Sequence, residues 1–331
     1  MSNVITLAHG GGGRLQNELI RQEIASRFAN PILNSLPDAA TTPENLVISS
    51  DSFVITPRFF PGGNIGKLAV AGTVNDVLMA GGVPKYLTCS LILEEGLEID
   101  ELRKILDSMR DEAAQAGVSI VTGDTKAVPR GTGDGVYINT TGVGFKRASM
   151  QLGQERFAVG DKIIVSGNIG EHGMSIMASR YALDCGELKS DCRILSPAVD
   201  AVFAAAGSGL KFMRDATRGG ALGIISEIFE NTPFGAVINE DALPVSPQAA
   251  AIAKLLGIDP GFAACEGCFA AVVSADAADK CIEKLHKING FAAAAVIGEV
   301  TIDAENVLMR TGWGSLRKLQ IPAGDQLPRI C

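Results

Sequence analysis

The chain has 331 residues, of which 47% are hydrophobic and 20% charged, and its formal net charge is −8. This composition is typical of a globular protein with room for two domains. The acidic balance argues against nonspecific binding to nucleic acid or to an anionic membrane surface, because both favour basic patches.

The sequence contains no apolar run of membrane-spanning length, and residues 1–9 lack the basic and apolar regions of a signal peptide. The seven cysteines are odd in number and widely spaced, unlike a secreted disulfide scaffold. We therefore expect a cytoplasmic protein with reduced thiols and with neither a nucleic-acid nor a membrane partner.

A glycine run is the first feature along the chain. Gly10, Gly11, Gly12 and Gly13 precede a helix-like stretch at 15–28. Backbone amides of glycines at the start of a helix can cradle phosphate, although the run matches neither the dinucleotide nor the P-loop pattern. A flexible linker is the other interpretation. Residues 1–46 are assigned to this N-terminal segment.

Residues 47–150 are expected to form a first α+β domain. β-branched and apolar residues predict strands at 47–56, 86–93, 118–122 and 135–144. Apolar spacing predicts helices at 64–80, where Asn64 is the expected N-cap, and at 98–116.

Residues 151–318 are expected to form a second α+β domain, since strands and helices mix without strict alternation. Helices are predicted at 173–182, 219–230, 247–256 and 277–288. Strands are predicted at 162–166, 236–239, 269–273, 294–300 and 307–310.

The segment 319–331 is expected to be a mobile arm that carries a thiol. Pro322, Gly324 and Pro328 disfavour a helix or a central strand, and the final residue is Cys331. A thiol on such an arm suits a carrier that receives a group at one place and delivers it to another. An incidental cysteine on a frayed tail is the alternative.

Four aspartates share a setting in small-residue turns or element ends, and they are Asp51, Asp76, Asp124 and Asp215. Carboxylates presented in this way hold Mg²⁺ against substrate phosphates. Aspartate also favours turns and caps for its own hydrogen bonding, so each alone has a structural explanation.

Several other polar residues are candidates for chemistry. Lys126 follows a predicted strand and could contact phosphate, and Arg218 could bind an anion. Glu266 lies between Cys265 and Cys268 in a tight turn and could act as a base. The paired cysteines could instead be redox-active or bind metal, but no second pair with suitable spacing accompanies them.

These motifs together resemble those of the HypE family, the carbamoyl dehydratases of nickel–iron hydrogenase maturation. The resemblance covers nearly the whole chain, and its most specific element is the terminal Pro328-Arg329-Ile330-Cys331. The aspartate and glycine motifs are shared with a wider PurM-like, ATP-using superfamily that includes aminoimidazole ribonucleotide synthetase.

The resemblance implies a two-domain α+β fold whose N-terminal domain closes a β-barrel with a second copy, giving a homodimer with nucleotide at the interface. It implies ATP and Mg²⁺ as cofactors, the carbamoyltransferase HypF as the partner that loads Cys331, and the HypC–HypD iron scaffold as the recipient of cyanide. In this chemistry Glu266 and Lys126 are the other catalytic residues, and the four aspartates hold the metal.

The nucleotide site implied by the resemblance includes the glycine run and residues Asn64, Lys67, Asn75, Thr122, Gly123, Thr125, Arg218, Gly219 and Gly220. Two alternatives stay open at this point. One is an enzyme of the same superfamily that acts on a free small molecule, as selenophosphate synthetase and thiamine-monophosphate kinase do. The other is a non-catalytic metal or thiol carrier.

Overall fold

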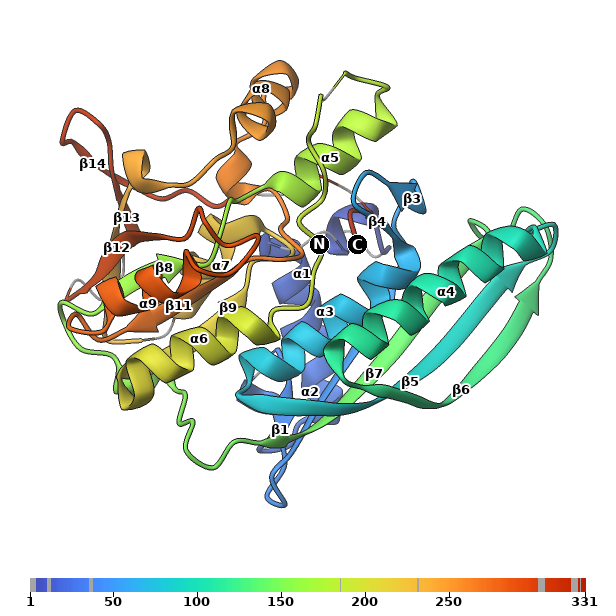
Figure 1. Ribbon diagram of the computed structural model, residues 1–331, viewed down its shortest axis with the longest axis horizontal. Helices are drawn as coiled ribbons and strands as arrows, with labels where there is room; N and C mark the ends of the chain where they lie inside the picture. Colours follow the sequence, from blue (N-terminus) through green and yellow to red (C-terminus); the bar gives the residue numbers. More distant parts are fainter. Residues whose placement is uncertain are drawn as a thin grey trace.

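A computed structural model describes residues 4–10, 13–35, 38–184, 186–230, 232–302, 307–322, 327 and 329–331. Two β-sheets with their helices lie side by side (Figure 1). Within the described part of the chain, no helix is both long and apolar enough to cross a membrane.

The first sheet has five strands in the order β1-β2-β7-β5-β6. Strands β5 and β6 pair in parallel, and the other neighbours in this order pair antiparallel. The strands are β1 (Ala40–Thr41), β2 (Leu46–Phe53), β5 (Gly82–Glu94), β6 (Ser119–Val128) and β7 (Val136–Lys146). A short hairpin of β3 (Phe59–Phe60) and β4 (Gly63–Asn64) leads into the helix that follows.

Helices α3 (Ile65–Met79) and α4 (Ile99–Ala116) lie beside each other along this sheet (Figure 1). The Asn64 side chain caps α3 by accepting from the amides of Gly66 and Lys67 at 2.8 and 3.1 Å. A Cβ on Gly66 would lie 2.3 Å from the carbonyl oxygen of Ile105, so only glycine permits this close approach of α4. Almost every residue of α3 is buried, since this helix is enclosed by the sheet, α4 and the second domain.

The second sheet has seven strands in the order β14-β13-β10-β12-β8-β11-β9. These are β8 (Lys162–Val165), β9 (Leu210–Asp215), β10 (Gly235–Asn239), β11 (Phe269–Val273), β12 (Ala295–Thr301), β13 (Val307–Arg310) and β14 (Leu316–Lys318). Its helices are α5 (Glu171–Arg180), α6 (Ser196–Ala206), α7 (Gly220–Phe229), α8 (Pro247–Leu256) and α9 (Ala278–Leu285).

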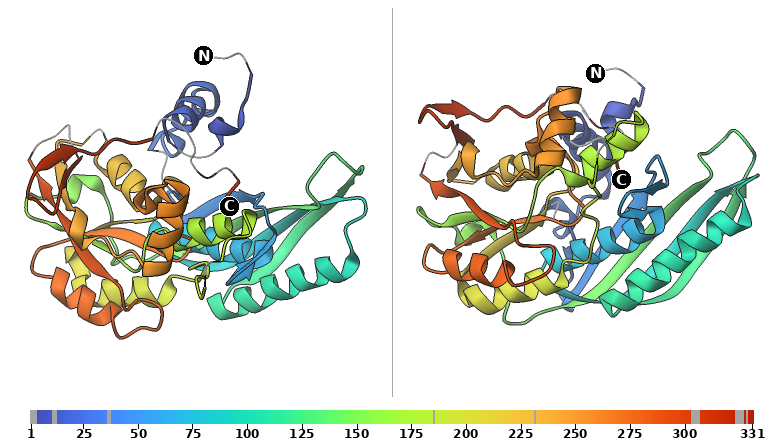
Figure 2. Two further views of the ribbon diagram at one scale, coloured as in Figure 1. Left: turned by 90° about the horizontal axis from the view of Figure 1, so that it is seen from above. Right: turned by 45° about the horizontal axis from the view of Figure 1, so that its top comes forward.

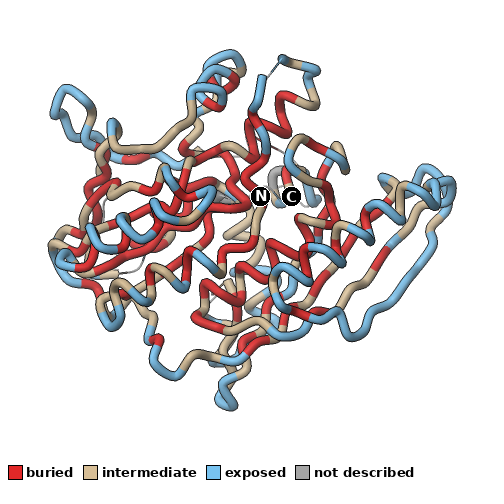
Figure 3. The backbone as a smooth tube through the Cα atoms, viewed as in Figure 1, coloured by how far each residue is buried: buried red, intermediate tan, exposed pale blue. Residues whose placement is uncertain are grey.

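Both faces of this second sheet are covered, as the burial of its central strands shows (Figure 3). Ile164 packs in the cluster that contains α6 and α9, whereas Ile163 and Val165 pack in the cluster that contains α7. This alternation follows from the two-residue period of a strand. The first cluster also contains residues of α3 and α4, so the two domains share one core.

Most of the predicted elements are observed within a few residues of their expected positions, and the differences have local causes. The predicted helix at 15–28 is divided into α1 (Gly13–Leu19), a π-helical turn at Ile20–Ala25 and α2 (Ser26–Phe28). Strand β9 and helix α6 were not predicted, because their apolar residues lack a clear period. Figure 2 shows the N-terminal helices standing off one side of the molecule, next to the C-terminal end.

The first sheet is open in this chain, and no closed barrel is formed by the residues that the structure describes. Its edge strand β6 is exposed over nearly all of its length. The predicted barrel would require a second copy and stays a prediction. In the tail, Ile321 is 47% exposed, whereas Leu327 and Ile330 near the chain end are buried.

Candidate active site

A cleft of about 760 Å³ is lined by residues of both domains and of the N-terminal helices. It brings together residues from Gln16 to Cys331, which lie 315 positions apart in the sequence. Six predicted site residues line it, and they are Asp51, Asp76, Asp215, Arg218, Glu266 and Cys331.

Three elements present the three aspartates of the cleft. Asp51 is on β2, Asp76 is near the end of α3, and Asp215 ends β9. The Ser49 hydroxyl donates to Asp76 Oδ2 at 2.6 Å, and the Thr73 hydroxyl donates to Asp51 Oδ2 at 3.4 Å. These bonds fix the carboxylates on rigid elements rather than on loops.

Burial and the repulsion among these carboxylates raise the pKa of Asp76 and of Asp215. Burial, and then the charges of Asp51 and Asp215, hold the pKa of Asp76 well above its usual range. The pKa of Asp215 is raised well above its usual range by burial and by the charges of Asp38 and Asp51. A divalent cation with its phosphate ligands would relieve this repulsion, so the donor set suits Mg²⁺.

The aspartates do not enclose a metal by themselves. Among the described residues, no three His, Cys, Asp or Glu side chains are gathered into a group that could hold a metal ion. Mg²⁺ commonly keeps several waters and binds through one or two carboxylates plus substrate phosphates, which agrees with such a spread-out set.

Two arginines provide positive charge in the cleft. Arg214 is held by Asp38 at 3.0 Å and by Glu227 at 3.2 Å. The pKa of Arg218 is raised, first by the charge at Cys331 and further by Asp51 and Glu266. Arg218 therefore lies where it can bind an anion at the chain end.

Glu266 is only 3% exposed, and its Oε1 atom has no hydrogen-bond partner. Burial, and then the charges of Asp215 and Asp191, raise its pKa well above the usual range of a carboxyl. An unpartnered carboxylate with a raised pKa is a stronger base than a solvated one. Its main chain is fixed by Asp191, which accepts from the amides of Glu266 and Gly267 at 3.0 and 3.1 Å.

The chain end is docked in the cleft. The Val54 amide donates to the Cys331 carbonyl at 3.1 Å, and the Arg329 guanidinium donates to the Val54 carbonyl at 2.9 Å. Arg329 also forms an ion pair with Asp134. The Cys331 side chain is half-buried and lies in the same cleft as Glu266.

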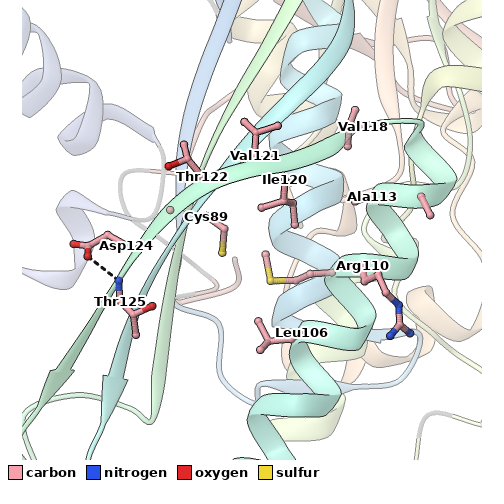
Figure 4. A pocket seen from close by; sticks show the side chains of 13 residues that line it. Cys89, Leu106, Arg110, Ala113, Val118, Ile120, Val121, Thr122, Asp124 and Thr125 are labelled. Atoms are coloured by element: carbon pink, nitrogen blue, oxygen red, sulfur yellow. Dashed lines mark hydrogen bonds between the residues drawn. The ribbon is translucent and has the colours of Figure 1, made fainter.

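A second group of predicted residues lies elsewhere, on the exposed edge strand β6. Asp124 pairs with Lys126 at 2.8 Å, and this contact lowers the pKa of Asp124. A hollow of about 910 Å³ between β6 and α4 is lined by Asp124 and its neighbours Thr122, Gly123 and Thr125 (Figure 4). Within one chain these residues are therefore not part of the cleft that holds Cys331.

Three residues expected at the nucleotide have structural contacts. Asn64 caps α3, and Lys67 Nζ donates to the Gly62 carbonyl at 3.2 Å. The Asn75 amide binds the main chain at both Arg193 and Leu195, at 3.0 and 2.9 Å. Asn75 thus joins α3 to the segment that precedes α6.

The glycine candidates begin two helices. Gly219 and Gly220 have φ of +82° and +62° at the start of α7, and a Cβ on Gly220 would lie 2.6 Å from the carbonyl of Ala263. Gly10 follows the turn at Leu7–His9, and Gly13 begins α1. The predictions for Gly11 and Gly12 fall outside the described residues.

The paired cysteines are fully enclosed. Cys265 and Cys268 are 0% and 1% exposed, and the Gly170 amide donates to Cys265 Sγ at 3.1 Å. Both thiols pack in the hydrophobic core that also contains residues of α7.

Sequence reasoning missed Asp38, Asp191 and Arg214. As an isolated histidine, His172 suggested a surface or capping role, whereas its side chain is 0% exposed. Asp191 and His172 are buried polar residues, and burial of a single polar residue has no periodic signal in a sequence. Arg214 directly precedes Asp215 in a motif that the sequence did single out, so its position could have been noted.

Comparison with known proteins gives a consistent result. Residues 36–145 match the N-terminal domain of AIR synthase related proteins, and residues 158–310 match the C-terminal domain. The chain is 41% identical to carbamoyl dehydratase HypE of Escherichia coli K12, over 99% of this chain and 100% of that protein.

Solved structures agree with the sequence comparison. A HypE–HypF complex superposes with a TM-score of 0.88 at 38% identity, covering 92% of this chain and 99% of that chain. A HypE structure in complex with ATP superposes with a TM-score of 0.82 at 39% identity, covering 99% of this chain and 100% of that chain.

Proposed function

Since the chain belongs to the HypE family of carbamoyl dehydratases, we propose that it converts an S-carbamoyl group on Cys331 into an S-cyano group, using ATP. The observation that carries the proposal is the position of Cys331 in one cleft with Glu266, Arg218 and acidic residues from both domains. The cyano group would supply the cyanide ligands of the iron in a nickel–iron hydrogenase.

The reaction needs a better leaving group than amide oxygen. The carbamoyl oxygen attacks the γ-phosphorus of ATP and ADP departs, so the oxygen becomes part of a phosphate ester. The two N–H protons and the phosphate then leave, the carbon–oxygen bond breaks, and the carbon–nitrogen bond becomes triple. Each turnover therefore yields one thiocyanate, ADP and phosphate.

Glu266 is suited to accept a proton from the carbamoyl nitrogen. Its carboxylate is buried in the cleft that holds the chain end, and burial raises its pKa, which makes it a stronger proton acceptor than a solvated carboxylate. Arg218 would neutralise negative charge at the reacting end. Asp51, Asp76 and Asp215 would hold Mg²⁺, which stabilises the charge on the transferring phosphoryl group when bound.

We further propose that the protein is a homodimer. The exposed strand β6 carries Ile120 and Val121, which are 41% and 56% exposed, and open strand edges favour pairing with another chain. In such a dimer, Asp124 and Lys126 of the partner subunit would complete the nucleotide site. This accounts for their separation from the other site residues within one chain.

HypF is the proposed source of the carbamoyl group, because a HypE relative of similar fold forms a complex with it. Loading requires the Cys331 thiol to leave the cleft, whereas dehydration requires the loaded thiol to return. We propose the HypC–HypD scaffold as the acceptor of the cyano group.

Intact mass spectrometry tests the function. The chain is incubated with HypF, carbamoyl phosphate and Mg-ATP, with Cys331→Ala as the matched control. The expected result is a carbamoyl adduct on the wild type that loses the mass of one water in an ATP-dependent step, and no adduct on the variant. Absence of an adduct on the wild type, with HypF shown to be active, would instead indicate an enzyme that acts on a free small molecule.

A further inference from the structure

We propose that His172 is a positioning residue for dehydration: it holds the carbonyl of Ile330 and thereby fixes the adjacent Cys331 beside Glu266. The inference rests on the proposed function, but its first test measures the reactivity of a thiol and needs no turnover.

The hydrogen bonds of His172 determine its tautomer. His172 is the second residue of α5 and is 0% exposed. Its Nε2 lies 2.7 Å from the Ile330 carbonyl, and because a carbonyl only accepts, Nε2 carries the proton. Its Nδ1 lies 2.7 Å from Ser190 Oγ and accepts from that hydroxyl. The Ser190 oxygen in turn accepts from the Cys192 amide at 3.1 Å.

The surroundings of the imidazole keep it neutral and immobile. Burial lowers the pKa of His172 to about 4, so the ring is uncharged at physiological pH. The Phe60 ring meets it edge to face, with 5.5 Å between centroids. The Ser190 amide donates to the Pro61 carbonyl at 2.8 Å, which fixes the hydroxyl that orients the ring. His172 is thus a rigid donor aimed at the tail.

Besides the ion pair of Arg329 with Asp134, several contacts that hold the tail are made to main-chain atoms. Arg180 donates to the carbonyls of Thr56 and Arg329, and Arg329 donates to the Val54 carbonyl. The Val54 amide donates to the Cys331 carbonyl. Contacts on both sides of residue 330 therefore fix the path of the backbone. Among these donors His172 is the fully buried one, so its loss would leave a carbonyl without a partner and away from water.

The two half-reactions, loading and dehydration, need different states of the tail: loading needs the tail released, and dehydration needs it docked. A donor that acts only on the docked tail shifts the equilibrium toward that state. Removing it is expected to lower the equilibrium constant for docking about tenfold, the equivalent of one buried hydrogen bond. Because the tail is docked in the structure, the undocked fraction should rise by a similar factor. Dehydration should slow because the carbamoyl group is held less firmly beside Glu266, while loading by HypF should stay the same or become faster.

Alkylation of Cys331 by iodoacetamide, located by peptide mass mapping, tests the inference. His172→Phe keeps the ring and its contact with Phe60 but removes the donor, and we expect Cys331 to react about tenfold faster. The matched control is His286→Phe, because His286 Nε2 also bonds a carbonyl, that of Ala294 at 2.8 Å, away from the tail. This control should label at the wild-type rate.

Two further variants keep the test decisive. His172→Gln restores a donor near the Nε2 position and should label at close to the wild-type rate. Ser190→Ala removes the group that orients the ring and should increase labelling less than His172→Phe does; it also decides the question if the phenylalanine variant fails to fold.

Separate measurements of loading and dehydration distinguish a positioning role of His172 from a merely structural one. Single-turnover dehydration of the carbamoylated chain should slow in His172→Phe, with loading not slowed. Unchanged labelling in a folded variant, or equal slowing of both half-reactions with a lower melting temperature, would overturn the inference. If the wild type is never dehydrated while labelling still responds to His172, the proposed function fails and the docking role stands.

Discussion

Replacing Glu266 with glutamine tests the role of the buried carboxylate. Glutamine has the same shape, and the Oε1 atom has no hydrogen-bond partner to lose. The Asp191 contacts hold the main chain of Glu266, not its side chain, so they persist in the variant. The change therefore removes proton acceptance and negative charge while the position of the loop is kept.

The expected loss is that of a general base. Such a group contributes about 10²–10⁴-fold to a rate, equivalent to about 3–5 kcal/mol of activation free energy. We expect dehydration of carbamoylated Cys331 to slow by this factor. Carbamoylation by HypF should be unaffected, because loading takes place with the thiol outside the cleft.

Although Glu266→Gln should slow dehydration, it should increase the free energy of unfolding. The pKa of Glu266 is raised in the folded chain, so the folded state binds its proton more tightly than the unfolded state does. Below the ordinary glutamate pKa of about 4.3, Glu266 is protonated in both the folded and the unfolded state, so its burial as a charge costs no stability. As pH rises from there through the raised folded-state pKa, the wild type loses stability. Glutamine does not titrate, so the stability advantage of the variant should grow with pH across this window.

Quenched-flow or manual-quench mass spectrometry gives the dehydration rate, and urea unfolding at several pH values gives the stability. Glu112→Gln is the matched control, since Glu112 is also buried with an unpartnered Oε1 and a pKa raised by burial, but lies outside the cleft. It should share the direction of the stability change without the loss of rate. A wild-type rate in the glutamine variant of Glu266, or equal slowing in both variants, would refute the assignment.

Three other predictions follow from the structure. Asp191→Ala should lower the free energy of unfolding by about 2–6 kcal/mol in urea titrations, because two buried amides lose their acceptor, and it should slow dehydration through the displaced Glu266. Asn75→Ala should destabilise by a similar amount, since it unpairs one main-chain carbonyl and one amide, and a wild-type melting temperature would contradict this. Val121→Glu should convert a dimer into a monomer in light scattering, whereas Leu255→Glu, at an exposed apolar position of α8, should leave the assembly unchanged.

The local chemistry of the chain could be predicted from sequence because it depends on neighbours a few residues apart. The Asn64 cap, the amphipathic helix α4 and its end at Gly117 all follow from short-range patterns, and each is observed. The π-helical turn at 20–25 and the strand β9 were not predicted, because tertiary contacts rather than periodicity determine them.

The sequence by itself determined which residue types were available for chemistry: a thiol at residue 331, acidic residues in small-residue turns, and Glu266 in a tight turn. Only the tertiary structure decided which of them meet. It brings Asp51, Asp76 and Asp215 together with Cys331 but leaves Asp124 on an open strand edge. It also supplies Asp191 and His172, whose roles arise from burial and from contacts 75 and 158 residues away. Long-range contacts of this kind depend on packing of the whole chain, and no local pattern specifies them.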